Sequence, residues 1–196
     1  KKIEKKIDSK TKLIFCESIG NPAANVTDIG KISELAHKHN IPLFIDNTVP
    51  SPYVCRPIEH GADIVIHSLT KYLCGHGTTI GGMIVDSGKF DWKSNSEKFP
   101  MLTTPDPAYH GIVFADACGS AAFITRARVV PLRNMGGAIS PMSSFQILQG
   151  IESLAVRMDR HCSNAEAVAE FLDRHDSVGW VNYPGLKSHP DNSLIE

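Results

Sequence analysis

Short apolar runs alternate with a helical pattern in the first part of the chain. Residues 13–16 are apolar, residues 28–40 carry apolar side chains at helical spacing, and residues 42–45 are apolar again. This pattern predicts a strand, a helix and a second strand. Thr27 or Asp28 is placed to cap the helix by accepting a hydrogen bond from an unpaired backbone N–H group.

Two further apolar runs, at residues 64–66 and 83–85, predict a third and a fourth strand. Pro50, Pro52 and Pro57 exclude a long regular element before the third strand, because proline lacks the backbone donor. The runs are apolar at consecutive positions, which is typical of strands that are covered on both faces. The sequence therefore predicts an α/β fold with a mostly parallel sheet covered by helices.

The second half of the chain is mainly helical in pattern. Residues 111–130 and 143–150 have helical composition, and residues 153–175 carry the clearest apolar stripe. Residues 90–109 are polar, contain proline and show no period, so a long loop is expected there. Residues 178–183 are expected to begin a strand of another layer.

Both ends of the chain look cut from something larger, because it begins just before a predicted strand and stops without a finishing element. The expected organisation is a large domain over residues 1–177, with its N-terminal part missing and a connecting helix at its end. Residues 178–196 are then the truncated start of a smaller C-terminal α/β domain.

Composition and charge narrow the class of partner. The 196 residues are 42% hydrophobic and 21% charged, which is typical of a globular protein, and the net charge of −1 provides no positive field for phosphate backbones or anionic membranes. No nucleic acid and no membrane partner is expected. The longest charge-free stretch, residues 134–151, contains polar side chains and proline that lipid would leave unsatisfied. Five cysteines without a C-x-x-C pair favour a reducing compartment, and we expect the cytoplasm.

Candidate chemistry gathers at the ends of two predicted strands. Asp46 directly follows the second strand, and Ser68, Thr70 and Lys71 follow the third. Because ligands lie beyond the carboxyl ends of parallel strands, these side chains are expected to converge at one crevice. Pyridoxal phosphate needs a lysine for its aldehyde, a carboxylate for its ring nitrogen and hydroxyl donors for its phosphate. It stays open that Lys71 and Asp46 bind no ligand, since most lysines are solvent-exposed and aspartates often end strands as turn formers.

Other motifs give weaker signals. The glycine-rich residues 75–82 match neither a dinucleotide nor a phosphate-loop pattern, so a close turn before a strand is expected. His37 and His39 lie two apart on a helix and cannot share a metal ion. Cys74 and His76 have no second pair at ligand spacing, so no metal is expected. His76 could touch a ligand or stabilise the turn.

Two residues of the last predicted helix are left outside the expected site. Cys162 is interpreted as a small, partly buried side chain. Arg157, with Arg160 close by, is interpreted as a surface or interface charge and is not counted among the site residues.

Four blocks of sequence resemble the Cys/Met-metabolism family of pyridoxal-phosphate enzymes in their order and spacing. They are ESIGNP at residues 17–22, IDNT at 45–48, HSLTKY at 67–72 and GHG at 75–77. The resemblance covers essentially the whole chain and implies the large domain of the aspartate-aminotransferase-like fold, with pyridoxal 5'-phosphate as cofactor. It also implies a role for each site residue: Lys71 as the catalytic Schiff-base lysine, Asp46 as the partner of the ring nitrogen, Asn21 as a donor near the ring hydroxyl, and Ser68 and Thr70 as phosphate ligands.

Within this family the sequence is most similar to O-acetylhomoserine sulfhydrylases, through residues 75–82, 137–141, 150–154 and 157–158 and the long loop at 90–109. This similarity implies a transferase that replaces the acetoxy group on the γ carbon of O-acetyl-L-homoserine with sulfide or a small thiol, giving homocysteine and acetate in methionine and cysteine biosynthesis. It also implies a homo-oligomer of active-site-sharing dimers, expected to be a tetramer. Ile19 and Cys74 depart from the family pattern, which commonly has proline and glycine there.

Two alternatives remain open. One is a cystathionine γ-synthase or methionine γ-lyase activity on the same cofactor. The other is a catalytically incomplete fragment with a structural or assembly role, because members of the family also use a phosphate loop, a ring-stacking aromatic residue and a carboxylate-binding arginine that would lie outside residues 1–196. The isolated polypeptide is therefore expected to turn over poorly.

Overall fold

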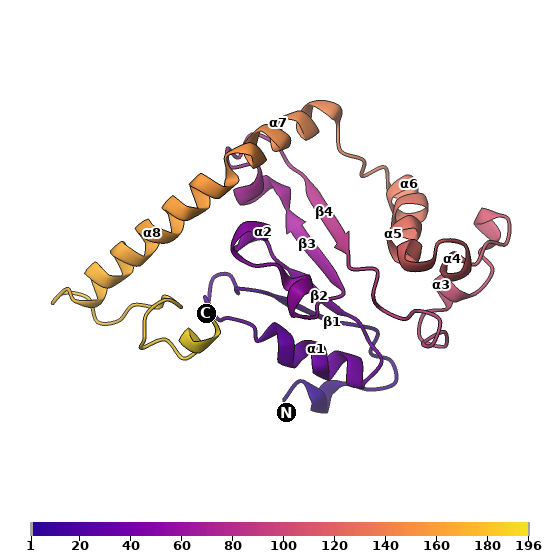
Figure 1. Ribbon diagram of the computed structural model, residues 1–196, viewed down its shortest axis with the longest axis horizontal. Coiled ribbons are helices and arrows are strands. Elements are labelled where there is room, and N and C mark those ends of the chain that lie inside the picture. Colours follow the sequence, from indigo (N-terminus) through magenta and orange to yellow (C-terminus); the bar gives the residue numbers. More distant parts are fainter. Residues whose placement is uncertain (1, 196) are drawn as a thin grey trace.

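The computed structural model describes residues 2–195, and a four-stranded sheet lies at its centre (Figure 1). The strands are β1 (Ile14–Glu17), β2 (Leu43–Asp46), β3 (Ile64–Ser68) and β4 (Gly82–Asp86), in that spatial order. β1 pairs with β2 and β2 with β3 in parallel, whereas β4 runs antiparallel to β3. The α/β class and the mostly parallel sheet are confirmed, and the antiparallel strand lies at one edge.

Helices connect the strands and continue beyond them. The α-helices are α1 (Ile29–Lys38), α2 (Ser51–Val54), α3 (Pro100–Thr103), α4 (Phe114–Ala117), α5 (Ala122–Ala127), α6 (Arg133–Met135), α7 (Pro141–Glu152) and α8 (Leu154–Asp173). Short 3₁₀ turns are η1 (Glu4–Lys6), η2 (Pro57–His60), η4 (Pro107–Tyr109), η5 (Gly119–Ala121) and η7 (Asn192–Leu194), and π-type turns are η3 (Leu69–Leu73) and η6 (Arg128–Leu132). Among residues 2–195, no helix has the length and apolar character that a bilayer crossing demands.

The main core lies between α1 and one face of the sheet. Ile29 and Ala36 of α1 pack with Leu43 and Ile45 of β2 and with Val65 of β3. Asp28, one of the two residues predicted to cap this helix, is its N-cap: the Asp28 side chain accepts a hydrogen bond from the Lys31 backbone N–H at 3.1 Å. Burial of this apolar stripe holds α1 against the sheet.

Apart from α2, which follows β2, the remaining helices form two groups on either side of the sheet (Figure 1). α7 and α8 follow one another as a long arm that contacts η3 at the end of β3. α3 to α6 gather on the other side around a second, largely aromatic core that includes Trp92, Phe99 and Phe114. The long loop expected at residues 90–109 is therefore largely irregular, as predicted, but it folds around this core.

Two sequence-based expectations are wrong in detail. Residues 111–130 form several short helices rather than one, because Gly119 adopts a left-handed φ of +53° that interrupts the helical path. Residues 178–183 form no strand. Trp180, the largest side chain in this segment, is 81% exposed and therefore packs against no neighbouring strand.

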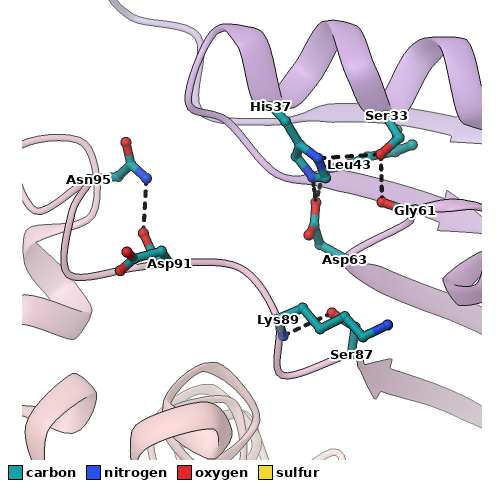
Figure 2. Close-up of polar contacts among 9 residues, drawn as sticks. All are labelled: Ser33, His37, Leu43, Gly61, Asp63, Ser87, Lys89, Asp91 and Asn95. Atoms are coloured by element: carbon teal, nitrogen blue, oxygen red, sulfur yellow. Dashed lines mark hydrogen bonds and ion pairs between the residues drawn. The ribbon is translucent and has the colours of Figure 1, made fainter.

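A buried carboxylate ties α1 to the starts of two strands (Figure 2). Asp63, directly before β3 and only 3% exposed, accepts a 2.8 Å hydrogen bond from the Leu43 backbone N–H through Oδ2. The same oxygen lies 2.9 Å from Nε2 of His37 in α1. Nearby, the Ser33 hydroxyl donates to the Gly61 carbonyl at 2.7 Å. These contacts set how α1 lies against β2 and β3, and with them the frame of the sheet.

Replacing Asp63 with alanine is expected to lower the free energy of unfolding by about 1–3 kcal/mol, because the buried Leu43 N–H loses its acceptor. Urea unfolding of the full-length protein, followed by circular dichroism, measures this. Asp91→Ala is the matched control, since Asp91 is exposed and, within residues 2–195, its side chain bonds only to nearby Ser94. Equal unfolding midpoints for the two variants would contradict the anchoring role of Asp63.

Candidate functional site

Asp46 and Ser68 end neighbouring parallel strands and share one face of the sheet. Asp46 of β2 stands opposite Ile66 of β3 in the register, and Ser68 follows two residues after Ile66. Because side chains alternate between the faces of a strand, Asp46, Ile66 and Ser68 project from the same face. The convergence expected from the sequence is therefore present for these two residues.

Thr48 connects the ends of the two strands. Asp46 Oδ1 accepts hydrogen bonds from the Thr48 backbone N–H at 2.9 Å and from the Thr48 hydroxyl at 2.5 Å. The same hydroxyl oxygen accepts a 2.9 Å hydrogen bond from the Ser68 backbone N–H. Within residues 2–195, Asp46 Oδ2 takes no hydrogen bond, so one carboxylate oxygen is fixed and the other is available.

Lys71 lies in a cleft of about 640 Å³ directly after β3. It belongs to η3, where the helical path breaks at Lys71 itself, with φ −87° and ψ −126°. Its side chain is exposed, and in the described part of the chain its amine makes no ion pair. The cleft is lined by side chains from four separate stretches of sequence, among them Asn21, Thr48, Thr70, Tyr72, Arg157 and His161.

The predicted site residues reach the cleft in two ways. Asn21, Thr70 and Lys71 line it directly, whereas Asp46 and Ser68 lie beside it and are linked to it through Thr48. The Thr70 hydroxyl is partly used within the protein, because it accepts a 3.0 Å hydrogen bond from Gly81 N and makes only a long 3.4 Å contact to Gly81 O.

The cleft also contains residues that were not predicted as site residues, among them Thr48, Arg157 and His161. Thr48 lies within one of the four motif blocks, but its link between the strand ends depends on the pairing of β2 with β3. His161 of α8 places its ring 5.4 Å from the ring of Tyr72. Arg157, interpreted from the sequence as a surface or interface charge, is half-buried and lines the cleft, and its guanidinium donates to the carbonyl oxygens of Tyr72 and Gly150. Two signals in the sequence pointed to Arg157: its spacing of four residues from Ser153, and the likeness of residues 157–158 to the sulfhydrylases.

His76 and His67 lie close to Lys71 in sequence but differ in surroundings. His76 Nδ1 lies 2.7 Å from the carbonyl oxygen of Cys74, which supports the turn-stabilising interpretation. His67 is 5% exposed and does not line the cleft. Burial lowers the pKa of His67 from its ordinary value of 6.5, while the Asn47 backbone and the Asp46 charge act weakly in the opposite direction.

Metal chemistry finds no support in the arrangement of side chains that the structure describes. Over residues 2–195, no three His, Cys, Asp or Glu side chains gather into a possible ligand set. The groups that line the cleft are an amine, an amide, hydroxyls, a guanidinium and an imidazole, and the Asp46 carboxylate lies beside it. These are organic acid–base and hydrogen-bonding groups.

The family follows from sequence comparison. Residues 1–196 match the Cys/Met metabolism PLP-dependent enzyme family, and the chain belongs to this family. Homocysteine synthase of Schizosaccharomyces pombe is 52% identical over 191 residues, which cover 97% of this chain and 44% of that protein. O-acetyl-L-homoserine sulfhydrylase of Leptospira meyeri is 50% identical over 189 residues, covering 92% of this chain and 42% of its own length. The chain thus spans less than half the length of these relatives.

Solved structures show the same fold. A crystal structure of an O-acetylhomoserine (thiol)-lyase from Campylobacter jejuni, which contains N'-pyridoxyl-lysine-5'-monophosphate, superposes with a TM-score of 0.93 at 40% identity. The match covers 98% of this chain and 48% of that one. O-acetylhomoserine sulfhydrylase of Wolinella succinogenes gives a TM-score of 0.84 at 34% identity, over 98% of this chain and 51% of its own. The sheet and its helices are those of PLP-dependent enzymes.

The buried His67 is expected to make the fold acid-sensitive. Its lowered pKa means that the unfolded chain binds a proton below about pH 6.5 while the folded chain does not, so stability falls as the pH drops through that range. The slope is at most about 1.4 kcal/mol per pH unit. Urea unfolding of the full-length protein at several pH values between about 7 and 5 measures this dependence. His67→Gln should flatten it, and an unchanged slope in that variant would exclude His67 as its origin.

Proposed function

We propose that the protein to which this chain belongs replaces the acetoxy group on the γ carbon of O-acetyl-L-homoserine with sulfide or a small thiol, giving homocysteine and acetate when sulfide is the donor. The observation that supports this most directly is the cleft in which Lys71 lies next to the strand ends that carry Asp46 and Ser68. The relatives named homocysteine synthase and O-acetyl-L-homoserine sulfhydrylase supply the substrate class. Because the chain spans less than half of those relatives, the activity is proposed for the whole protein.

The groups left unused by the fold match the parts of pyridoxal 5'-phosphate. Lys71 has an amine for the aldehyde, and Asp46 has a carboxylate oxygen that makes no hydrogen bond within residues 2–195. In the same described region, the side chains of Asn21 and Ser68 make no hydrogen bonds of their own. These four side-chain groups therefore match, in the same order, an aldehyde, a protonated ring nitrogen, a ring hydroxyl and a phosphate.

When bound, the cofactor supplies an aldehyde that condenses with amines and a ring that withdraws electrons from the substrate carbons. Lys71 would hold the aldehyde carbon through Nζ and, once the substrate amine displaces it, would take a proton from the substrate and return it later. Asp46 would hold the ring nitrogen in its protonated form through Oδ2, because Thr48 already fixes the orientation of the carboxylate through Oδ1.

The remaining residues would orient the cofactor. Asn21 would donate from its amide to the ring hydroxyl. Ser68 would donate its hydroxyl proton to the phosphate, and Thr70 would do the same in place of its long contact to Gly81 O, while still accepting from Gly81 N. The phosphate and ring would then be gripped by the segment that also carries Lys71.

We propose further features of the whole protein on the strength of the family resemblance. Residues 1–177 form part of the cofactor domain, and residues 178–196 begin a smaller domain. The working form is a cytoplasmic homo-oligomer, a dimer of active-site-sharing subunits assembled into a tetramer. Sedimentation of the full-length protein with and without pyridoxal phosphate measures the subunit number.

The reaction itself is tested with the full-length protein, O-acetyl-L-homoserine and different sulfur donors. Release of homocysteine and acetate with sulfide is the expected result. Preferential use of cysteine with formation of cystathionine would assign the cystathionine γ-synthase reaction instead. Breakdown of methionine without a thiol acceptor would assign the γ-lyase reaction. Each product has a different mass, so liquid chromatography with mass spectrometry distinguishes the three.

Lys71 is expected to be the residue that bonds to the cofactor. The full-length protein is mixed with pyridoxal phosphate, reduced with borohydride and digested, and the adduct should lie on the peptide that contains Lys71. Lys71→Ala should abolish this label. Lys89→Ala is the matched control, because Lys89 is an exposed lysine outside the cleft, and it should keep the label. A label on other lysines in the wild-type protein contradicts the assignment.

Asp46→Ala is expected to weaken cofactor binding and to lower turnover by at least about 10²-fold, because the ring nitrogen loses the charge that keeps it protonated. Thr48→Val should have a smaller effect in the same direction, since it keeps the carboxylate but removes the hydroxyl that orients it. Cofactor titration by absorbance and steady-state kinetics measure both quantities. Unchanged turnover in Asp46→Ala would reject its role at the ring nitrogen.

A further inference from the structure

Arg157 reaches from α8 to the turn that carries Lys71. Its Nη1 donates to the carbonyl oxygen of Tyr72 at 2.8 Å, and its Nη2 donates to the carbonyl oxygen of Gly150 at 2.6 Å. Its Nε donates to the Ser153 hydroxyl at 3.1 Å. One side chain thus joins the residue after Lys71 to the end of α7 and the start of α8.

The form of the guanidinium suits this task. Its N–H groups lie in one plane in a fixed fork, so it can hold acceptors in two directions at once, whereas a lysine ammonium is a point charge on a flexible stem. In the described part of the chain, Arg157 makes no ion pair with a carboxylate. Its contacts are therefore those of a clamp on the main chain rather than of a salt bridge.

The surrounding backbone is fitted closely around this clamp. Gly75 has φ +77°, and a Cβ built there would lie 2.6 Å from the Arg157 guanidinium carbon. A Cβ on Gly150 would lie 2.0 Å from the carbonyl oxygen of Cys74. Only glycine at these two positions allows α7 and the arginine to approach the turn so closely. The turn is thus enclosed on the side of the α7–α8 junction.

Lys71 is bracketed by two anchors of the main chain. On one side, Thr70 is held to Gly81 through its hydroxyl. On the other, Tyr72 is held to Arg157 through its carbonyl oxygen. Lys71 itself departs from helical geometry, so the regular helical ladder does not by itself define its backbone position. Its own carbonyl oxygen accepts a 2.8 Å hydrogen bond from the Gly75 N–H, and the anchors before and after it add to this contact in placing the amine.

We infer that Arg157 is a positioning residue that fixes Lys71 in the cleft by clamping the Tyr72 carbonyl to the junction of α7 and α8. The inference rests on the proposed function in that Lys71 is taken as the reactive amine. A shift of about 1 Å in a reacting group can cost about 10²-fold in rate, so loss of the clamp should slow the steps that use the Lys71 amine more than it weakens substrate binding.

The test compares Arg157→Ala and Arg157→Lys with Arg160→Ala in the full-length protein. Arg160 is the matched control, because it lies three residues further along α8 and is exposed. The measurements are the rate at which Lys71 forms its borohydride-reducible adduct with pyridoxal phosphate, kcat and KM for sulfhydrylation, and the folded fraction by circular dichroism. Each is repeated with guanidinium chloride at tens of millimolar, well below denaturing levels.

Arg157→Ala is expected to fold. Its rate of adduct formation and its kcat should both fall by about 10- to 100-fold, with little change in KM. Guanidinium should restore part of both rates in this variant and in no other. Arg157→Lys should show a partial loss, because it keeps the charge without the fork. Arg160→Ala should match the wild type in every measurement.

Other outcomes overturn the inference. One is an adduct rate and a kcat in Arg157→Ala that stay within about twofold of the wild type. Another is a fall in both rates that only parallels the folded fraction and is not rescued by guanidinium. If Arg157→Ala does not fold, wild-type rates in a folded Arg157→Lys decide against the clamp. If the wild-type protein forms the Lys71 adduct but shows no sulfhydrylase activity, the proposed reaction is wrong. The role of Arg157 is then still tested by the rates of adduct formation.

Discussion

The parallel pairing of β2 with β3 is the constraint on which the candidate site depends. It brings two strand ends, far apart in sequence, to the same edge of the sheet, and Thr48 then joins Asp46 to the backbone of Ser68. The carboxylate is held on one side only, so an oxygen remains for a partner. Because the register of a strand decides the face of every side chain, a slip by one residue would turn Asp46 away from Ser68.

The elements that the sequence predicted well are those whose signal is local. The apolar run at residues 42–45 became β2 (Leu43–Asp46), and one of the two proposed caps of α1, Asp28, accepts the expected hydrogen bond. The expectation of a strand at residues 178–183 failed, because an apolar run indicates a strand only where a partner edge is available, and Trp180 stays exposed.

The site shows the same division between local and long-range information. Asp46 and Lys71 could be chosen from their chemistry and their places at strand ends, and their residue types matched a family pattern. Arg157 could not be chosen this way, since its partners are carbonyl oxygens, which every residue carries. Only the path of α8 across the turn reveals that the arginine, rather than the nearby Arg160, meets Tyr72. A backbone-directed contact leaves no pair of complementary side chains to find in a sequence.

The separation between Lys71 and Arg157 along the chain has a consequence for biosynthesis. The ribosome releases a polypeptide from its N-terminal end, and the segments fold as they emerge. Lys71 and the strand ends around it therefore leave the exit tunnel well before α8 does, and for that interval the Tyr72 carbonyl is without the guanidinium. Completion of the cleft must wait for translation of α8, because Arg157 and His161 on that helix form part of its lining.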